Sequence, residues 1–216
     1  MEDQSALMNR LYRPQKYIYD LTRKHFLPGR EVLLRAMAVP ARGRVLEAGC
    51  GTARNLILLA RKYPDSTFFG FDASTEMLAV ARRKITRRGL HERIRIGPAL
   101  AEEFDRQVIF GVEAPFDAAY FSYSLSMMPR WRQALDQVLA QIRCGGWLYI
   151  ADFCDMEGWP GCLRRSIQKL LRTYHTVYRP ESLEYLRTLA ENGKGVLTVK
   201  TLMRGYAHVA EFKTQS

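Results

Sequence analysis

The sequence predicts an α/β fold: a doubly wound, mostly parallel sheet of seven strands that ends in an antiparallel hairpin. Between residues 44 and 191, short apolar segments of strand character alternate with segments of helical periodicity, which is typical of βαβ units. Residues 196–203 and 206–213 then alternate apolar and polar side chains on either side of Arg204-Gly205, as the two strands of a hairpin do. A chain of 216 residues without an internal linker can bury one core of this kind.

The parallel part of the sheet is expected to contain five strands joined by helices. The strands are predicted at residues 44–48, 67–71, 93–96, 116–121 and 147–153. Helices are predicted at residues 52–62, 75–88, 131–142 and 182–191. Apolar residues recur at helical spacing in the first of these, as Leu56, Leu59 and Ala60 show. The run Cys144-Gly145-Gly146 is expected to end the third helix, because glycine is favoured directly after a helix.

The charge of the chain indicates an anionic partner. It carries 33 Lys and Arg against 22 Asp and Glu, a net charge of +11, and its pI is near 9.7. Such a surface favours nucleic acid or an acidic membrane face, and charge alone does not distinguish them. No apolar run is long enough to span a bilayer and the chain shows no signal-peptide pattern, so a cytoplasmic location is expected. The four cysteines and four histidines are scattered, so no metal site is expected.

A glycine-rich turn follows the first predicted strand. Gly49 and Gly51 add little bulk, so the backbone can approach a ligand closely, and the helix expected from Thr52 directs its free N–H groups at that ligand. Asp72 ends the second strand about 20 residues later, where a carboxylate can accept from two ribose hydroxyls. A dinucleotide site would need a third glycine at position 54, and the bulk of Arg54 would crowd a pyrophosphate there. A tight turn without a ligand remains the alternative for the glycine run alone.

The run Glu47-Ala48-Gly49-Cys50-Gly51 resembles motif I of S-adenosylmethionine-dependent methyltransferases. A parallel sheet closed by a terminal hairpin likewise resembles the Rossmann-like class I fold of that family. The resemblance implies S-adenosylmethionine as the cofactor, with Glu47 helping to bind its ammonium group. Many relatives have Gly-Asp-Ala after the third strand, whereas this chain has Gly97-Pro98-Ala99, so the adenine contacts are expected at Leu100–Glu102 instead. For Glu102, a solvated acid at a helix start is an equal alternative.

Carried over by family position, the predicted cofactor-binding residues are Tyr19, Glu47, Gly49, Cys50, Gly51, Thr52, Asn55, Asp72, Ala73, Met77, Leu100, Ala101, Glu102 and Ser122.

The loop after the fourth strand reads Ser122-Tyr123-Ser124-Leu125-Ser126-Met127. It is not the Asn/Asp-Pro-Pro-Tyr loop of enzymes that methylate planar nitrogens, and it contains no cysteine that could attack a base, so nucleic acid is not the expected acceptor. This loop, together with the run from Tyr12 to Arg23, resembles diacylglycerylhomoserine N-methyltransferases, which make betaine lipid. The resemblance implies three successive methylations of a lipid amine. It also implies a separate aminocarboxypropyl transferase that makes the homoserine lipid.

Tyrosines are the predicted partners of the amine. Tyr19 and Tyr123 are expected to be catalytic, Tyr123 also contacting the substrate, and Tyr12 and Tyr178 are lesser substrate candidates. A tyrosine oxygen can hold an amine, and a tyrosine face attracts a cation by about 0.5–2 kcal/mol. For each single tyrosine, simple packing is an equal alternative.

A basic amphipathic helix is expected between residues 163 and 174. One face carries Leu163, Ile167, Leu170, Leu171 and Tyr174, and the other carries Arg164, Arg165, Lys169 and Arg172. No acid occurs from Leu163 to Pro180. Such a helix lies on anionic lipid, so we expect a peripheral protein on the inner face of a membrane. A helix packed on the domain with a solvated basic face is the alternative.

The domain organisation follows from these expectations. Residues 1–43 are predicted to form a helical cap that contacts substrate, and residues 44–216 the methyltransferase domain, in which 154–180 is an insertion facing substrate and membrane. Four other functions remain open: phosphatidylethanolamine N-methylation, small-molecule methylation, RNA methylation, and a non-catalytic methyltransferase-like subunit.

Overall fold

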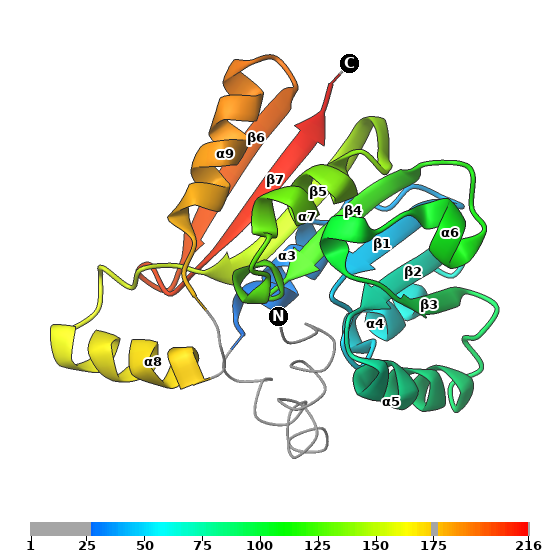
Figure 1. The fold of residues 1–216 in the computed structure, drawn as a ribbon, viewed down its shortest axis with the longest axis horizontal. Helices are drawn as coiled ribbons and strands as arrows, with labels where there is room; N and C mark the ends of the chain where they lie inside the picture. Colours follow the sequence, from blue (N-terminus) through cyan, green and yellow to red (C-terminus); the bar gives the residue numbers. More distant parts are fainter. Residues whose placement is uncertain (1–26, 174–176, 216) are drawn as a thin grey trace.

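The computed structural model describes residues 27–173 and 177–215. These residues form one seven-stranded sheet in the order β3-β2-β1-β4-β5-β7-β6, covered by helices on both faces (Figure 1). The strands are β1 (Arg44–Ala48), β2 (Thr67–Asp72), β3 (Ile94–Pro98), β4 (Phe116–Ser122), β5 (Ile142–Phe153), β6 (Gly195–Leu202) and β7 (Ala207–Thr214). The α-helices are α3 (Gly29–Ala36), α4 (Arg54–Lys62), α5 (Thr75–Thr86), α6 (Arg106–Phe110), α7 (Trp131–Leu139), α8 (Gly161–Thr173) and α9 (Pro180–Glu191), and the short 3₁₀ turns are η1 (Ala101–Glu103) and η2 (Leu125–Met127).

The topology confirms the predicted fold. Strands β1 to β5 pair in parallel, and β7 runs antiparallel to both β5 and β6. The chain winds outward from β1 in two directions, so the order reverses between β1 and β4. Open α/β sheets bind their ligands at the carboxyl side of such a reversal.

Each face of the sheet has its own apolar core. Helices α3, α4 and α5 pack on one face, where Val45 of β1 joins Leu33, Leu56 and Leu78. Helices α7 and α9 pack on the other face, where Leu46 joins Leu135 and other buried side chains. Successive residues of β1 therefore enter opposite cores, which explains why this strand is apolar along nearly its whole length.

Two predicted helix boundaries were wrong. Helix α4 begins at Arg54, not Thr52, because Gly51 and Ala53 have left-handed φ values of +53° and +59°, which an α-helix cannot contain. Helix α7 ends at Leu139, and Cys144-Gly145-Gly146 lies inside β5 rather than after a helix. There Gly145 has φ +70°, and a Cβ on Gly146 would lie 2.9 Å from the Asp117 carbonyl oxygen. These glycines serve the irregular start of β5, where its register with β4 shifts. Strand β5 was predicted to begin at residue 147 but begins at Ile142, and the remaining predicted boundaries differ from the observed ones by a residue or two.

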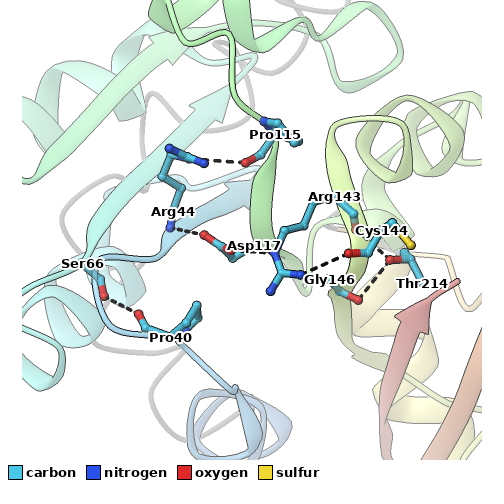
Figure 2. Close-up of polar contacts among 9 residues, drawn as sticks. All are labelled: Pro40, Arg44, Ser66, Pro115, Asp117, Arg143, Cys144, Gly146 and Thr214. Carbon is cyan, nitrogen blue, oxygen red and sulfur yellow. Dashed lines mark hydrogen bonds and ion pairs between the residues drawn. The ribbon is translucent and has the colours of Figure 1, made fainter. Parts of the chain in front are cut away.

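A polar network ties the strands together at the edge opposite their carboxyl ends (Figure 2). The carboxylate of Asp117 accepts from the Arg44 backbone N–H at 2.8 Å and from Arg143 Nε at 2.7 Å. The hydroxyl of Thr214 donates to the Arg143 and Gly146 carbonyl oxygens at 2.9 and 3.2 Å. These bonds join β1, β4, β5 and β7 without using the edge at which a ligand would bind.

Candidate cofactor site

A cavity that is open to solvent lies at the carboxyl ends of β1, β2 and β4. It is lined by Arg30, Glu47, Gly49, Cys50, Gly51, Thr52, Arg54, Asn55, Phe71, Asp72, Ala73, Met77, Ala99, Leu100, Ala101, Glu102, Ser122, Tyr123, Ser124, Met127 and Met128. Every predicted cofactor-binding residue in the described part of the chain is in this set, while Tyr19 lies outside the described residues. That these residues contact a cofactor remains a prediction.

The glycine turn forms one wall of the cavity. Gly49 and Gly51 have left-handed φ values of +75° and +53°, which favour glycine. A Cβ on Gly49 would lie 2.7 Å from the Ser124 Cβ, so the close approach of the two loops requires glycine there. A Cβ on Gly51 would meet nothing within 4 Å, so this residue borders open space. The Gly51 N–H donates to Asp72 Oδ2 at 2.8 Å, and the Ser74 N–H donates to Oδ1 at the same distance, which orients the carboxylate at the cavity wall.

Glu47 places a buried carboxyl group at the base of the cavity. Its side chain is only 2% exposed. Oε1 accepts from Asn55 Nδ2 at 2.7 Å, whereas Oε2 has no hydrogen-bond partner among the described residues. Burial raises the pKa of Glu47 to about 8, against the lowering effects of Asn55, the Tyr120 hydroxyl and the Arg30 charge. A buried acceptor without a partner is costly, so this carboxyl group is suited to a cationic ligand.

The opposite end of the cavity is mostly apolar. Met77 of α5 and Ala101 of η1 are 1% and 4% exposed, and Leu100 and Ala99 continue the same wall. Glu102 follows at its rim. This wall suits a flat heterocycle, whereas the end at Glu47 suits a charged group.

Comparison with known proteins agrees with this geometry. Residues 45–146 match the family model described as a methyltransferase domain. The chain has the fold of the apo S-adenosylmethionine-dependent methyltransferase SibL, with a TM-score of 0.70 and 20% identity over 94% of this chain and 59% of SibL. It also has the fold of geranyl diphosphate methyltransferase, solved with sinefungin, with a TM-score of 0.63 and 16% identity over 86% of this chain and 77% of the other.

Residues 45–146 match a methyltransferase domain, and the seven-stranded sheet has the class I fold of S-adenosylmethionine-dependent methyltransferases. Curated proteins of similar sequence are also named as methyltransferases. Demethylmenaquinone methyltransferase of Thermus thermophilus is 29% identical over 62% of this chain and 60% of its own length. Trans-aconitate 2-methyltransferase of Methylobacterium nodulans is 29% identical over 57% of this chain and 43% of its own length. The chain therefore spans between about two fifths and three fifths of these relatives.

The cavity of the methyltransferase domain fits the family's cofactor. S-adenosylmethionine carries an ammonium group, for which Glu47 Oε2 is a buried acceptor without a described partner. It carries ribose hydroxyls, for which Asp72 is placed at the end of β2. The buried Ser122 Oγ also lacks a hydrogen-bond partner among the described residues and lies on the same cavity wall.

The predicted amine-binding tyrosines are placed differently from one another. Tyr123 lines the cavity, but its side chain is 1% exposed, its ring packs against Phe153, and its hydroxyl accepts from the Gly29 N–H at 3.0 Å. This placement makes Tyr123 an anchor for α3 and gives no support to its predicted contact with an acceptor. Tyr178 is partly buried, with a pKa raised to about 12 mainly by burial, and is not among the residues that line the cavity. Tyr12 and Tyr19 lie outside the described residues.

Several residues that line the cavity were missed by sequence reasoning. Arg30 comes from α3, which ends at Ala36, well before the glycine turn at Gly49. No sequence motif identifies Arg30 as a cavity residue. Ser124 donates through its hydroxyl to the Ala48 carbonyl oxygen at 2.7 Å and so fixes the loop after β4 against the glycine turn. Met127 and Met128 border the cavity from that loop. Arg54, considered only as an obstacle to a dinucleotide, pairs with Glu31 at 3.4 Å.

Replacing Glu47 with Gln is expected to stabilise the unliganded protein at alkaline pH and to weaken cofactor binding. Because the folded-state pKa of about 8 exceeds the ordinary 4.5, the folded state binds more protons than the unfolded state between these values. The contribution of Glu47 to stability therefore falls as pH rises through that window. We expect Glu47→Gln to change the melting temperature little at pH 5 and to raise it by a few degrees at pH 8.5, at about 2–4 °C per kcal/mol.

The same variant should bind S-adenosylmethionine at least about tenfold more weakly, because it loses a charged hydrogen bond. Thermal melts from pH 5 to 9 and calorimetry measure the two effects, with Glu103→Gln, an exposed acid outside the cavity lining, as the matched control. A Glu47→Gln protein whose melting temperature tracks the wild type at every pH contradicts this account.

Proposed function

We propose that the protein transfers methyl groups from S-adenosylmethionine to the amine of a membrane lipid, with diacylglycerylhomoserine as the acceptor and a betaine lipid as the product. The observation that carries the proposal is a basic amphipathic helix, α8, on the same edge of the sheet as the cofactor cavity. Strand β5 ends at this edge with Phe153, and α8 begins at Gly161 and projects from the body (Figure 1).

Helix α8 has both features of a surface that docks on anionic lipid. Ile167 and Leu171 pack against the core, whereas Leu163 and Leu170 remain 44% and 49% exposed. Arg165 and Lys169 are exposed beside them. Exposed apolar side chains flanked by cations are typical of helices that lie at a membrane interface. Since Ile167 and Leu171 also pack on the domain, one face of the helix holds it in place while another is available to lipid.

The same surface continues at the β6–β7 turn. The Trp159 Nε1–H donates to the Met203 carbonyl oxygen at 2.7 Å, which holds the start of the insertion against this turn. Met203 is 56% exposed, and Arg204 follows it. A second exposed apolar side chain with a neighbouring cation therefore lies next to the segment that leads into α8. Among the described residues, no helix is both long and apolar enough to cross a bilayer, so docking at the surface is the mode of membrane contact proposed.

The choice of a homoserine lipid is supported by sequence resemblance. The run from Tyr12 to Arg23, outside the described residues, and the run from Ser122 to Met127 resemble diacylglycerylhomoserine N-methyltransferases. In the structure the second run ends β4 and forms η2, and both Ser122 and Met127 line the cavity. A separate aminocarboxypropyl transferase would have to supply the homoserine lipid.

In this reaction the main role of the protein is to bind the cofactor and the acceptor and to align them. When bound, S-adenosylmethionine supplies a methyl group that is already activated on a sulfonium. Glu47 would hold its ammonium group and Asp72 its ribose hydroxyls, and Met127 and Met128 would border the side from which an acceptor enters. Fixing the reactants in line and excluding bulk water is a large source of rate enhancement in such transfers. The amine must lose a proton, which water can accept, and Tyr12 and Tyr19 remain the proposed partners of the amine.

Other acceptors are alternatives that the experiment must separate. Phosphatidylethanolamine offers the same kind of amine in the same setting. The names of the relatives favour a different class, since one acts on demethylmenaquinone and another on trans-aconitate. A non-catalytic role would not require the glycine turn, Glu47 and Asp72 to be present together.

Purified protein with methyl-labelled S-adenosylmethionine is expected to label diacylglycerylhomoserine in vesicles, and mass spectrometry should find products with one, two and three added methyl groups. Matched reactions contain phosphatidylethanolamine vesicles, demethylmenaquinone or trans-aconitate. Glu47→Gln, at S-adenosylmethionine concentrations below saturation, serves as the control of reduced activity. Label in phosphatidylethanolamine alone would replace the homoserine assignment, label in trans-aconitate or demethylmenaquinone alone would replace the amine-lipid assignment, and an unlabelled homoserine lipid contradicts the proposal.

Replacing Arg164, Arg165, Lys169 and Arg172 by Gln is expected to weaken binding to anionic vesicles at least about tenfold, because each cation near such a surface contributes roughly 1 kcal/mol. Co-sedimentation with anionic and with neutral vesicles measures this change. The matched control removes the same charge from the exposed end of α5 and the turn after it through Arg82, Arg83, Arg87 and Arg88. Equal losses from both sets would show a nonspecific effect of net charge and would remove α8 from the docking surface.

A further inference from the structure

Two buried ionisable side chains, one acidic and one basic, line the cofactor cavity. One is Glu47 at the end of β1, and the other is Arg30 in the first turn of α3, which is 9% exposed. The Arg30 charge acts on the pKa of Glu47 and lowers it, although burial still keeps that pKa near 8. Burial raises the pKa of Tyr120 and of Tyr123, and the charge of Arg30 opposes this rise in both.

Helix α3 is held firmly before any ligand arrives. At its start the Gly29 N–H donates to the Tyr123 hydroxyl at 3.0 Å, and a Cβ on Gly29 would lie 2.9 Å from that oxygen. At its end the Ala38 N–H donates to the Tyr149 hydroxyl at 3.0 Å, and the Tyr63 hydroxyl donates to the Met37 carbonyl oxygen at 3.3 Å. The backbone that carries Arg30 is therefore fixed, and a fixed binding group loses little entropy when a ligand binds.

The methionine end of S-adenosylmethionine is a zwitterion, with an ammonium and a carboxylate on one carbon. Glu47 can neutralise the ammonium, but a carboxylate taken from water into this cavity also needs a charged donor. A guanidinium is the side chain best matched to a carboxylate, because it donates two parallel hydrogen bonds. Arg54 also lines the cavity, but its side chain is 27% exposed, so it is less removed from water than Arg30.

We propose that Arg30 binds the carboxylate of the methionine end, so that Glu47 and Arg30 together recognise the zwitterion. Because this assignment needs S-adenosylmethionine in the cavity, it rests on the proposed function. It adds a consequence for α3, which carries Arg30: a bound cofactor is tied to α3 as well as to the sheet. Backbone amides of α3 should then exchange more slowly with solvent when the ligand is present.

Calorimetry with three ligands isolates the role of Arg30. S-adenosylhomocysteine has both the ammonium and the carboxylate, S-adenosyl-3-thiopropylamine lacks only the carboxylate, and 5′-methylthioadenosine lacks both. Arg30→Gln is expected to weaken S-adenosylhomocysteine binding roughly ten- to hundredfold. The affinity for the other two ligands should stay within about twofold of wild type, because neither reaches Arg30 with a carboxylate. Arg30→Lys should retain part of the lost affinity, and Arg54→Gln is the matched control.

Other outcomes overturn the assignment in distinguishable ways. If Arg30→Gln weakens all three ligands equally, Arg30 acts on the structure of the cavity and does not bind the carboxylate. If wild type binds S-adenosylhomocysteine and S-adenosyl-3-thiopropylamine equally well, no carboxylate site exists, and this comparison needs no folded variant. If wild type binds none of the three ligands, the cofactor assignment fails, and the proposed function fails with it.

Discussion

The arrangement of the site depends on how the fold accommodates the carboxyl group of Glu47. This group is almost fully removed from water, and only one of its oxygens has a hydrogen-bond partner among the described residues. Burial raises its pKa to about 8, so the unliganded cavity holds it without full compensation. An uncompensated buried polar atom costs on the order of 1–3 kcal/mol. The ammonium group that we propose Glu47 binds would remove that cost, which would link binding energy directly to the fold.

The sheet topology makes this burial possible. Strand β1 is central, its side chains enter a core on each face, and Glu47 therefore ends up beneath α3 and α4. The glycine turn that follows runs so close to the loop after β4 that a Cβ on Gly49 would meet Ser124. The Gly29 and Ala38 N–H groups donate to the Tyr123 and Tyr149 hydroxyls, which holds α3 in place. The reversal of strand order between β1 and β4 brings the glycine turn and the loop after β4 to one cavity.

The features that could be predicted from the sequence are those encoded locally. The glycine turn, Glu47 and Asp72 follow from spacing along two strands, and the terminal hairpin follows from alternation. Arg30 could not be found in this way, because its place in the cavity depends on how α3 packs across the sheet. The run Cys144-Gly145-Gly146 was interpreted by a local rule for helix ends. In the structure, a Cβ on Gly146 would clash with the neighbouring strand β4, which no local rule predicts. Tyr123 lines the cavity, but its ring is buried in the core and its hydroxyl accepts a hydrogen bond from the Gly29 N–H at the start of α3.

The most direct test of the central claim is a carbon-13 NMR titration of the Glu47 carboxyl group, with and without saturating S-adenosylhomocysteine. Without ligand the pKa should be near 8. With ligand it should fall enough to lower the proton affinity of the carboxyl group by about tenfold or more, because a bound ammonium group favours the ionised form. A pKa that stays the same when the cavity is saturated would show that Glu47 does not meet the cation, and the account of this site would be wrong.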